Sequence, residues 1–251
     1  MDKQKMIQFD IKGKTALVTG ANRGIGKAFV EYLAQHGARK IYACVRDAST
    51  FDSLSAINQD VVEPVLLDVT QAAQIQALAS KLTSLDLLIN NAGIIEACLA
   101  SADNALEVAR VEMETNYFAP LNLSLALLPL LKQSKGAIVN ISSIAGISNF
   151  PTISPYSDSK AAIHSLTLGL RAELSSQGIL VAGVYPGPIE TRMTVDFEMD
   201  KAPPSQVAER TFNGIAKGDI SIFPDDFSEA MYAEFLSHPR ELEKIFAGMI
   251  A

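Results

Sequence analysis

The fold of this chain is decided near its amino end by an apolar run and the glycine-rich turn after it, Thr15-Ala16-Leu17-Val18 and then Thr19-Gly20-Ala21-Asn22-Arg23-Gly24-Ile25-Gly26. The apolar run is typical of a short buried parallel strand. Apolar residues at helical spacing follow from Lys27 to Ala34, and Gly37 is placed to end that helix. The glycines therefore lie between a strand and a helix, which is the context that a dinucleotide-binding turn requires.

Glycines in such a turn permit a tight bend and let the backbone approach a pyrophosphate closely. The helix that follows offers free N–H groups and the positive end of its dipole to the phosphates. For the glycines in isolation, an ordinary glycine-rich turn stays open as an alternative. The candidate contacts in this turn are Gly20, Asn22, Arg23, Gly24, Ile25 and Gly26.

Strand and helix patterns alternate along the rest of the chain. Further strands are predicted at 40–45, 61–67, 85–89, 136–142, 179–185 and 220–223, and Pro64 should lie at the start of its strand or at a bulge. Long helices are predicted over 104–132 and 155–177, with another from about residue 228. We therefore predict an α/β fold, a single Rossmann-type doubly wound domain over residues 1–251. Its parallel seven-stranded sheet is flanked by helices and binds ligands at the carboxyl ends of its strands.

A candidate catalytic group lies further along the chain. Tyr156 and Lys160 are four residues apart and share one face of a helix. A nearby ammonium favours the phenolate, so we expect Lys160 to lower the pKa of Tyr156 and make it usable as an acid or base near neutral pH. Ser143 ends a predicted strand and can hold a carbonyl oxygen, whereas alternation sends Ser142 to the other face. Asn116 lies in the middle of a predicted helix, where Asn is an unfavourable residue. The alternative to a functional role is that Asn116 is simply an exposed polar residue.

The order and spacing of these motifs resemble the short-chain dehydrogenase/reductase (SDR) family, from about residue 13 to residue 191. The motifs are Thr-Gly-x-x-x-Gly-x-Gly, Asn90-Asn91-Ala92-Gly93, Asn116, Ser143, Tyr156-x-x-x-Lys160 and Pro186-Gly187. The resemblance implies a carbonyl reductase or alcohol dehydrogenase that uses all four catalytic candidates. In the family, the residue at Asn116 bends its helix and binds a water of the proton relay, and the lysine bonds the nicotinamide ribose. Three alternatives stay open: a 3-oxoacyl-thioester reductase, a nucleotide-sugar epimerase or dehydratase, and a non-catalytic dinucleotide-binding regulator.

The end of the second strand indicates which cofactor is bound. Family members specific for NAD usually carry an acidic residue where this chain has Val45. Arg46 follows it, and Arg23 stands in the glycine-rich turn, so two guanidinium groups could grip the 2′-phosphate of NADP(H). Asp47 is the competing ribose ligand, and Arg46 could instead be a solvated loop charge.

The resemblance also implies further contacts to the cofactor. Asp68 would bond the adenine amino group, with the backbone of Val69 beside the ring; Asp68 could equally cap the helix that follows. The remaining expected contacts are Asn91, Gly93, Tyr156, Lys160, Pro186, Gly187, Ile189 and Thr191.

Apolar side chains around these motifs suggest the substrate. The segment at about 187–204 is expected to be a mobile lid, although its apolar residues could simply pack it down. A small apolar carbonyl compound or alcohol would contact Ile94, Ile95, Ser143, Ile144, Phe150, Met193 and Phe197.

Composition and charge narrow the partners and the location. A net charge of −7 without a basic patch argues against nucleic acid. Cys44 and Cys98 have no metal-ligand spacing and suggest no disulfide, so we expect no metal and a reduced cytoplasmic setting. The first six residues lack the apolar core of a signal peptide, and the apolar run 121–131 is too short for a membrane span. That run is apolar on several faces, which favours a homodimer or homotetramer unless the carboxyl-terminal helix covers it.

Overall fold

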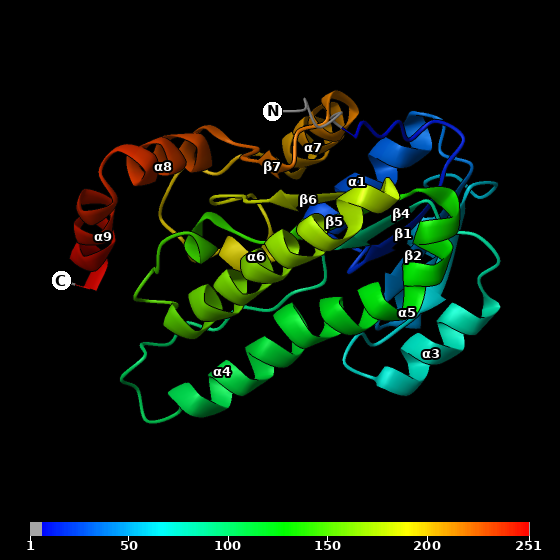
Figure 1. Cartoon of the computed structure of the whole chain (residues 1–251). Helices are drawn as coiled ribbons and strands as arrows, with labels where there is room; N and C mark the ends of the chain where they lie inside the picture. Colours follow the sequence, from blue (N-terminus) through cyan, green and yellow to red (C-terminus); the bar gives the residue numbers. More distant parts are fainter. Residues whose placement is uncertain (1–6, 251) are drawn as a thin grey trace.

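The computed structural model describes residues 7–250, which form a seven-stranded parallel sheet with helices on both faces (Figure 1). The strand order is β3-β2-β1-β4-β5-β6-β7, and every neighbouring pair is parallel. The strands are β1 (Thr15–Thr19), β2 (Lys40–Val45), β3 (Val62–Leu66), β4 (Leu87–Asn90), β5 (Ala137–Ile141), β6 (Leu180–Val184) and β7 (Ser221–Ile222). The predicted doubly wound fold is confirmed. The first six residues, on which the signal-peptide expectation rests, lie outside the described residues.

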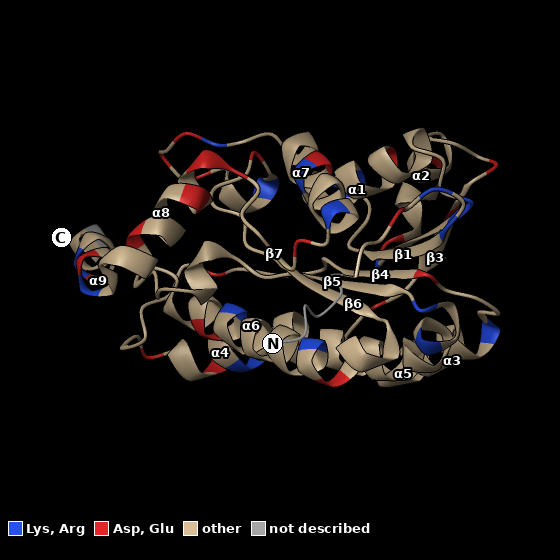
Figure 2. Cartoon of the chain, turned by 45° about the horizontal axis from the view of Figure 1, so that its top comes forward, with Lys and Arg blue, Asp and Glu red and all other residues tan. Residues whose placement is uncertain are grey.

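The helices divide into two layers, which Figure 2 shows above and below the sheet. One layer contains α1 and α7, and the other contains α3, α4, α5 and α6. The helices are α1 (Gly24–Gln35), α2 (Phe51–Ser55), α3 (Ala72–Lys81), α4 (Ala105–Met113), α5 (Ala119–Ser134), α6 (Ser154–Leu174), α7 (Pro204–Lys217), α8 (Asp226–Ser237) and α9 (Pro239–Ala247). Side chains of β1 alternate between the layers, Ala16 and Val18 packing towards α1 and Leu17 towards α5.

Strand β3 tolerates Pro64 because it is the edge strand. Pro64 stands in the middle of β3, in register with Ala43 of β2, rather than at the start or at a bulge as we expected. A proline lacks a backbone N–H, and the outer edge of a sheet has no neighbouring strand that needs this donor.

The long helix predicted over 104–132 is present, but it contains a local widening. Helices α4 and α5 are continuous through a π-helical turn, Glu114–Phe118, which contains Asn116. Such turns insert an extra residue into a helix and bend it. Leu123, Leu127 and Leu131 of α5 are fully buried against the sheet, whereas Leu125 is exposed.

The carboxyl end forms two helices where one was predicted. Asp225 caps α8 in a capping box with Ser228, and α9 buries Leu242 and Phe246. The ring of Phe246 packs on Phe150 with 3.9 Å between the centroids. These helices project at one end of the sheet (Figure 1), so the alternative in which a carboxyl-terminal helix covers α5 does not hold. Within residues 7–250, the helices are too short or too polar to cross a membrane.

Candidate active site

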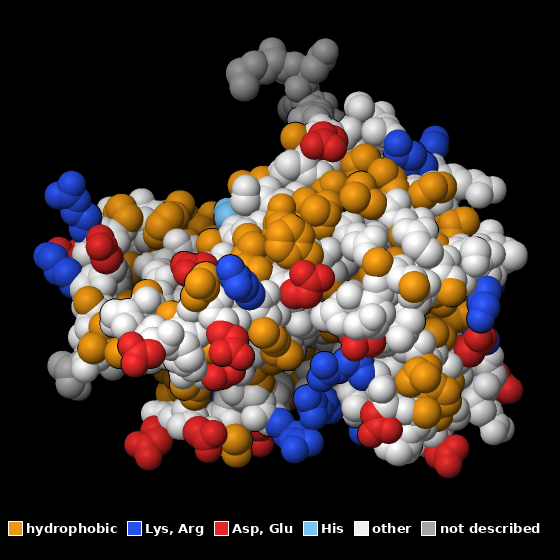
Figure 3. Space-filling view, turned by 90° about the horizontal axis from the view of Figure 1, so that it is seen from below, with side chains coloured by type: hydrophobic (Ala, Val, Ile, Leu, Met, Phe, Trp, Pro, Cys, Tyr) orange, Lys and Arg blue, Asp and Glu red, His pale blue; other side chains and the backbone are white. Residues whose placement is uncertain are grey.

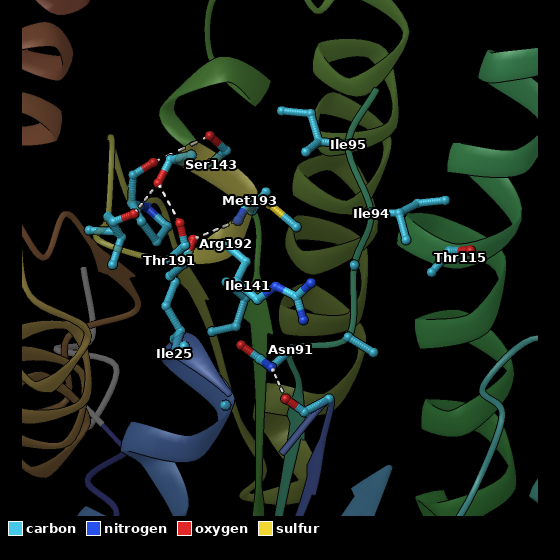
Figure 4. A pocket seen from close by; sticks show the side chains of 18 of the residues that line it. Ile25, Asn91, Ile94, Ile95, Thr115, Ile141, Ser143, Thr191, Arg192 and Met193 are labelled. Carbon is cyan, nitrogen blue, oxygen red and sulfur yellow. Dashed lines mark hydrogen bonds between the residues drawn. The ribbon is translucent and has the colours of Figure 1, made fainter. Parts of the chain in front are cut away.

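The loops at the carboxyl ends of β1 to β6 surround one cavity of about 630 Å³, shown in Figure 4. This volume lies within the range of small-molecule and cofactor sites. Parallel strands bring these loops together because their carboxyl ends meet at one edge of the sheet. Every predicted cofactor and substrate residue lines the cavity, and so do Ser143, Tyr156 and Lys160. Asn116 is the one predicted site residue that does not.

The glycine-rich turn leaves space that side chains would fill. Gly20 and Gly24 have φ angles of +64° and +52°, which favour glycine. A Cβ atom on Gly26 would lie 2.1 Å from the Gly20 carbonyl oxygen. Arg23 begins α1 without a side-chain cap, so the first-turn N–H groups face the cavity as an anion-binding terminus. This cradle fits the pyrophosphate of a dinucleotide.

Asn91 braces the turn against the sheet. Its Nδ2 donates to the Thr19 carbonyl oxygen at 2.8 Å. The Thr19 hydroxyl in turn accepts from the backbone N–H groups of Asn91 and Ala92, both at 2.9 Å. The turn after β4 is therefore tied to the glycine-rich turn after β1, and Figure 4 shows Asn91 on the floor of the cavity.

The charges at the end of β2 lie beside the cavity. Arg46 is exposed there and attracts Asp68, whose pKa is lowered chiefly by the hydrogen bond from the Thr70 backbone. Asp68 does not cap α3, which begins after Gln71. The carboxylate of Asp47 accepts from the Ser49 N–H at 2.9 Å and caps the short turn after β2.

Tyr156 and Lys160 face the cavity from one side of α6. Lys160 Nζ lies 5.5 Å from the centroid of the tyrosine ring and donates to the Ile141 carbonyl oxygen at 2.8 Å. Both residues are buried. Burial raises the pKa of Tyr156, and the Ser143 hydroxyl opposes that change only in part. The expected lowering of the tyrosine pKa is therefore wrong for the chain alone, because loss of solvation outweighs the hydrogen bond from Ser143, which acts in the opposite direction. Burial lowers the pKa of Lys160 to about 8.

The two serines after β5 have different surroundings. Ser143 accepts from the Ala145 N–H at 3.1 Å, and its hydroxyl donates to the Pro186 carbonyl oxygen at 3.3 Å. Ser142 donates to the Lys160 carbonyl oxygen at 2.8 Å and so is held by the backbone of α6. Ser143 is thus the serine beside Tyr156, as the strand alternation predicted.

Asn116 lies behind the cavity wall and is 1% exposed, so it is not a surface residue. Its side chain pairs with both backbone groups of Ile94, accepting from the N–H and donating to the carbonyl oxygen, each at 2.9 Å. Its Nδ2 also donates to the Ser159 hydroxyl on α6 at 2.9 Å. The π-helical turn thus joins α6 to the loop after β4.

The apolar walls come from several distant segments. The predicted residues Ile94, Ile95, Ile144, Phe150, Met193 and Phe197 all line the cavity. Thr115 and Phe227 also line the cavity, and the sequence analysis missed both. Phe227 comes from α8, which is held to the loop after β6 by a 2.8 Å hydrogen bond from the Gly187 N–H to the Asp225 carboxylate. No local pattern in the sequence indicates that contact.

Two backbone hydrogen bonds join the two ends of the segment that was expected to be a lid. The Glu190 N–H donates to the Ala202 carbonyl oxygen at 2.9 Å, and the Ala202 N–H donates to Pro188 at 3.1 Å. Between these anchors, Met193, Val195 and Met199 are exposed. Figure 4 places Arg192 and Met193 over the cavity between Thr191 and Ile94.

Comparison with known proteins agrees with this geometry. Residues 14–202 match the sequence family described as short chain dehydrogenase. This chain belongs to the short-chain dehydrogenase family. An oxidoreductase of Staphylococcus saprophyticus is 35% identical over 80% of this chain and 90% of its own length. The 3-oxoacyl-[acyl-carrier-protein] reductase FabG of Vibrio cholerae is 36% identical over 74% of this chain and 77% of its own.

Solved structures extend the similarity to nearly the whole chain. A short chain dehydrogenase from Burkholderia cenocepacia, solved in complex with NADP, has a TM-score of 0.89 and 34% identity to this chain. The alignment covers 95% of this chain and 99% of the Burkholderia chain. The similarity therefore includes the segments after residue 202, where the family match ends.

Proposed function

We propose that this chain is an NADP(H)-dependent carbonyl reductase or alcohol dehydrogenase for small apolar substrates. The single observation that carries the proposal is one cavity that joins the glycine-rich turn to Ser143, Tyr156 and Lys160. The first part fits a dinucleotide pyrophosphate, and the second fits a carbonyl group that is gaining a proton.

The preference for NADP(H) rests on charges around the adenosine end of the cavity. Arg23 and Arg46 both line it, and neither forms a salt bridge within the described residues. Asp47 is engaged with Ser49, which leaves it poorly placed to hold a ribose hydroxyl. The Burkholderia relative was solved with NADP, which supports the same choice.

The catalytic roles follow from the positions of the side chains. When bound, NADPH supplies a hydride to the carbonyl carbon. The Ser143 hydroxyl can donate to the carbonyl oxygen, where negative charge develops, and Tyr156 can transfer its proton to that oxygen. The burial that raises the pKa of Tyr156 keeps the phenol protonated, which suits it as the acid for reduction. Lys160 then stabilises the phenolate, and Asn116 fixes the loop that carries Ile94.

The substrate end of the cavity favours an apolar compound. Its walls carry isoleucine, phenylalanine and methionine side chains from four separate segments, and residues 187–204 form the lid in this proposal. A 3-oxoacyl thioester is the second candidate, which the similarity to the Vibrio reductase favours. The exposed lid residues Asp196, Glu198 and Asp200 would repel an acidic carrier protein, so a free ketone or aldehyde is preferred.

The assembly and location are proposed on separate grounds. Val111, Phe118 and Leu125 are exposed at seven-residue intervals on α4, the π-helical turn and α5. Figure 3 shows hydrophobic side chains gathered on the face seen from below. We call these three residues the apolar stripe, and propose that it pairs with a second copy in a homodimer or homotetramer. Cys44 and Cys98 are both free, which fits the cytoplasm.

Turnover of a substrate panel tests the proposal. NADPH oxidation is followed by absorbance with aldehydes, ketones, steroids and acyl thioesters, for the wild type and Tyr156→Phe. Removing only the hydroxyl should keep NADPH binding and lower kcat by about 10²–10⁴-fold. A Tyr156→Phe variant within about threefold of the wild type would remove the catalytic assignment, and no turnover with any compound would favour the regulator.

A further inference from the structure

Glu112 is a buried acid that the proposed chemistry does not use. It lies on α4 and is 1% exposed. Its Oε1 accepts from the Glu96 backbone N–H at 2.8 Å. Its Oε2 is one of three buried side-chain oxygen or nitrogen atoms that have no hydrogen-bond partner among the described residues, and the other two belong to neutral groups, Asn90 and Thr211. A carboxyl group is seldom buried in this way unless a charge compensates it.

Glu112 lies on α4, which packs against α6, the helix that carries Lys160. Glu112 lies four residues before Asn116, and both side chains bind the loop after β4, Glu112 at Glu96 and Asn116 at Ile94. Asn116 Oδ1 and Lys160 Nζ both approach Gly93, at 3.2 Å and 3.5 Å from where a Cβ atom would stand. In Figure 4, Thr115 and Ile94 mark the side of the cavity where this helix and loop meet.

Lys160 needs a counter-charge that its nearest contact does not supply. Its Nζ donates to the Ile141 carbonyl oxygen, which is neutral, and Lys160 forms no salt bridge with any of residues 7–250. The titratable groups that interact electrostatically with Glu112 are Glu96, Asp158, Tyr156 and Lys160. Lys160 is the single cation of this set.

We propose that Glu112 is a positioning residue whose buried carboxylate is the counter-charge that keeps Lys160 protonated beside Tyr156. This inference rests on the catalytic roles proposed above. The same side chain holds the Glu96 backbone and so fixes the loop that carries Ile94 and Ile95. One residue therefore couples the charge of the catalytic helix to the shape of the cavity wall.

The charges on the two groups set the pH range of the effect. Burial raises the pKa of Glu112 to about 7, while the hydrogen bond from Glu96 and the charge of Lys160 act in the opposite direction. Burial lowers the pKa of Lys160 to about 8, and Glu112 partly offsets this. Between these values both groups are charged. Without Glu112, Lys160 loses its proton at a lower pH, and reduction should fail earlier on the alkaline side.

The test compares pH profiles of kcat for NADPH-dependent ketone reduction. Glu112→Gln keeps an oxygen for the Glu96 N–H but cannot ionise. Its alkaline limb should move down by about one pH unit, because Lys160 loses the opposite charge that raises its pKa. Glu112→Asp, which can still ionise, should keep the alkaline limb close to that of the wild type. Glu114→Gln changes an exposed carboxylate on the same helix and should leave the profile unchanged.

Two outcomes would overturn the inference. One is an alkaline limb in Glu112→Gln that coincides with that of the wild type. The other is an equal shift in Glu114→Gln, which would mean that the effect comes from overall charge rather than from the buried site.

A spectroscopic measurement separates this inference from the proposed function. The ¹³C NMR signal of Lys160, assigned by its loss in Lys160→Met, should titrate about one pH unit lower in Glu112→Gln than in the wild type. If the wild type turns over no ketone, the proposed function fails while this signal still decides the inference. If Glu112→Gln does not fold, the wild-type signal alone decides, since it should show a second inflection near pH 7 as Glu112 ionises. A single inflection would refute the coupling.

Discussion

Gly26→Ala should separate binding of the cofactor from the rest of the fold. The added Cβ would lie 2.1 Å from the Gly20 carbonyl oxygen and 2.5 Å from Asn91 Nδ2, where ordinary contact begins at 3.4 Å. The glycine-rich turn must therefore open by more than about 1 Å. Because the contacts are backbone and a braced amide, the strain cannot be relieved by rotating a flexible side chain.

The magnitude follows from two separate costs. Overpacking of a buried site costs about 1–3 kcal/mol, which corresponds to a fall in Tm of about 3–10 °C for a chain of this size. Moving the turn by about 1 Å also displaces the N–H groups meant for the pyrophosphate, and we expect NADPH affinity to fall by about 10²-fold or more. Differential scanning fluorimetry gives the Tm, and NADPH fluorescence titration gives the Kd.

Gly248→Ala is the matched control, because a Cβ there meets nothing within 4 Å and the backbone φ is −64°. It should leave both Tm and Kd unchanged. A Gly26→Ala variant that binds NADPH within about threefold of the wild type would refute the assignment of this turn to the cofactor.

Three further predictions concern the cofactor, the pH dependence and the assembly. Arg46→Asp should weaken NADPH by about 10- to 100-fold and favour NADH, since it removes a cation and adds repulsion against the 2′-phosphate; a wild-type kcat/KM higher with NADH would point to Asp47 instead. Native Glu112 keeps its proton to about pH 7, whereas the unfolded chain loses it nearer its ordinary value of 4.5, so wild-type stability should fall relative to Glu112→Gln as pH rises through that window. Tm measured for both proteins at pH 5 and pH 8 checks the sign, and an equal difference at the two values contradicts it. Light scattering at micromolar concentration should give a multiple of 26.9 kDa, and a mass near one chain would refute pairing through the apolar stripe.

The sequence by itself determined the architecture and most of the cavity. Local patterns suffice for the glycine-rich turn, because strand, glycines and helix are contiguous and each has a short-range physical cause. The spacing of Tyr156 and Lys160 likewise fixes their common helix face. Strand alternation assigned Ser143 rather than Ser142 to the tyrosine, and the contacts of both serines agree.

The sequence analysis did not predict the features that depend on contacts between residues far apart in the chain. Phe227 reaches the cavity from α8 only because Asp225 ties that helix to Gly187. The second carboxyl-terminal helix is held by Phe246 against Phe150, a contact between residues far apart in the chain. Pro64 was expected at the start of its strand or at a bulge, because the edge position of β3, which tolerates a proline, is a property of the whole sheet.

Burial and charge were the properties that only the tertiary structure decided. Lys160 was expected to lower the pKa of Tyr156, but burial in the folded chain raises it. Glu112 reads in sequence as one more surface charge on a helix rich in them, yet the fold buries it and binds it to the backbone of the loop after β4. The cost of removing a charge from water depends on every segment packed around it, so no local pattern reveals it.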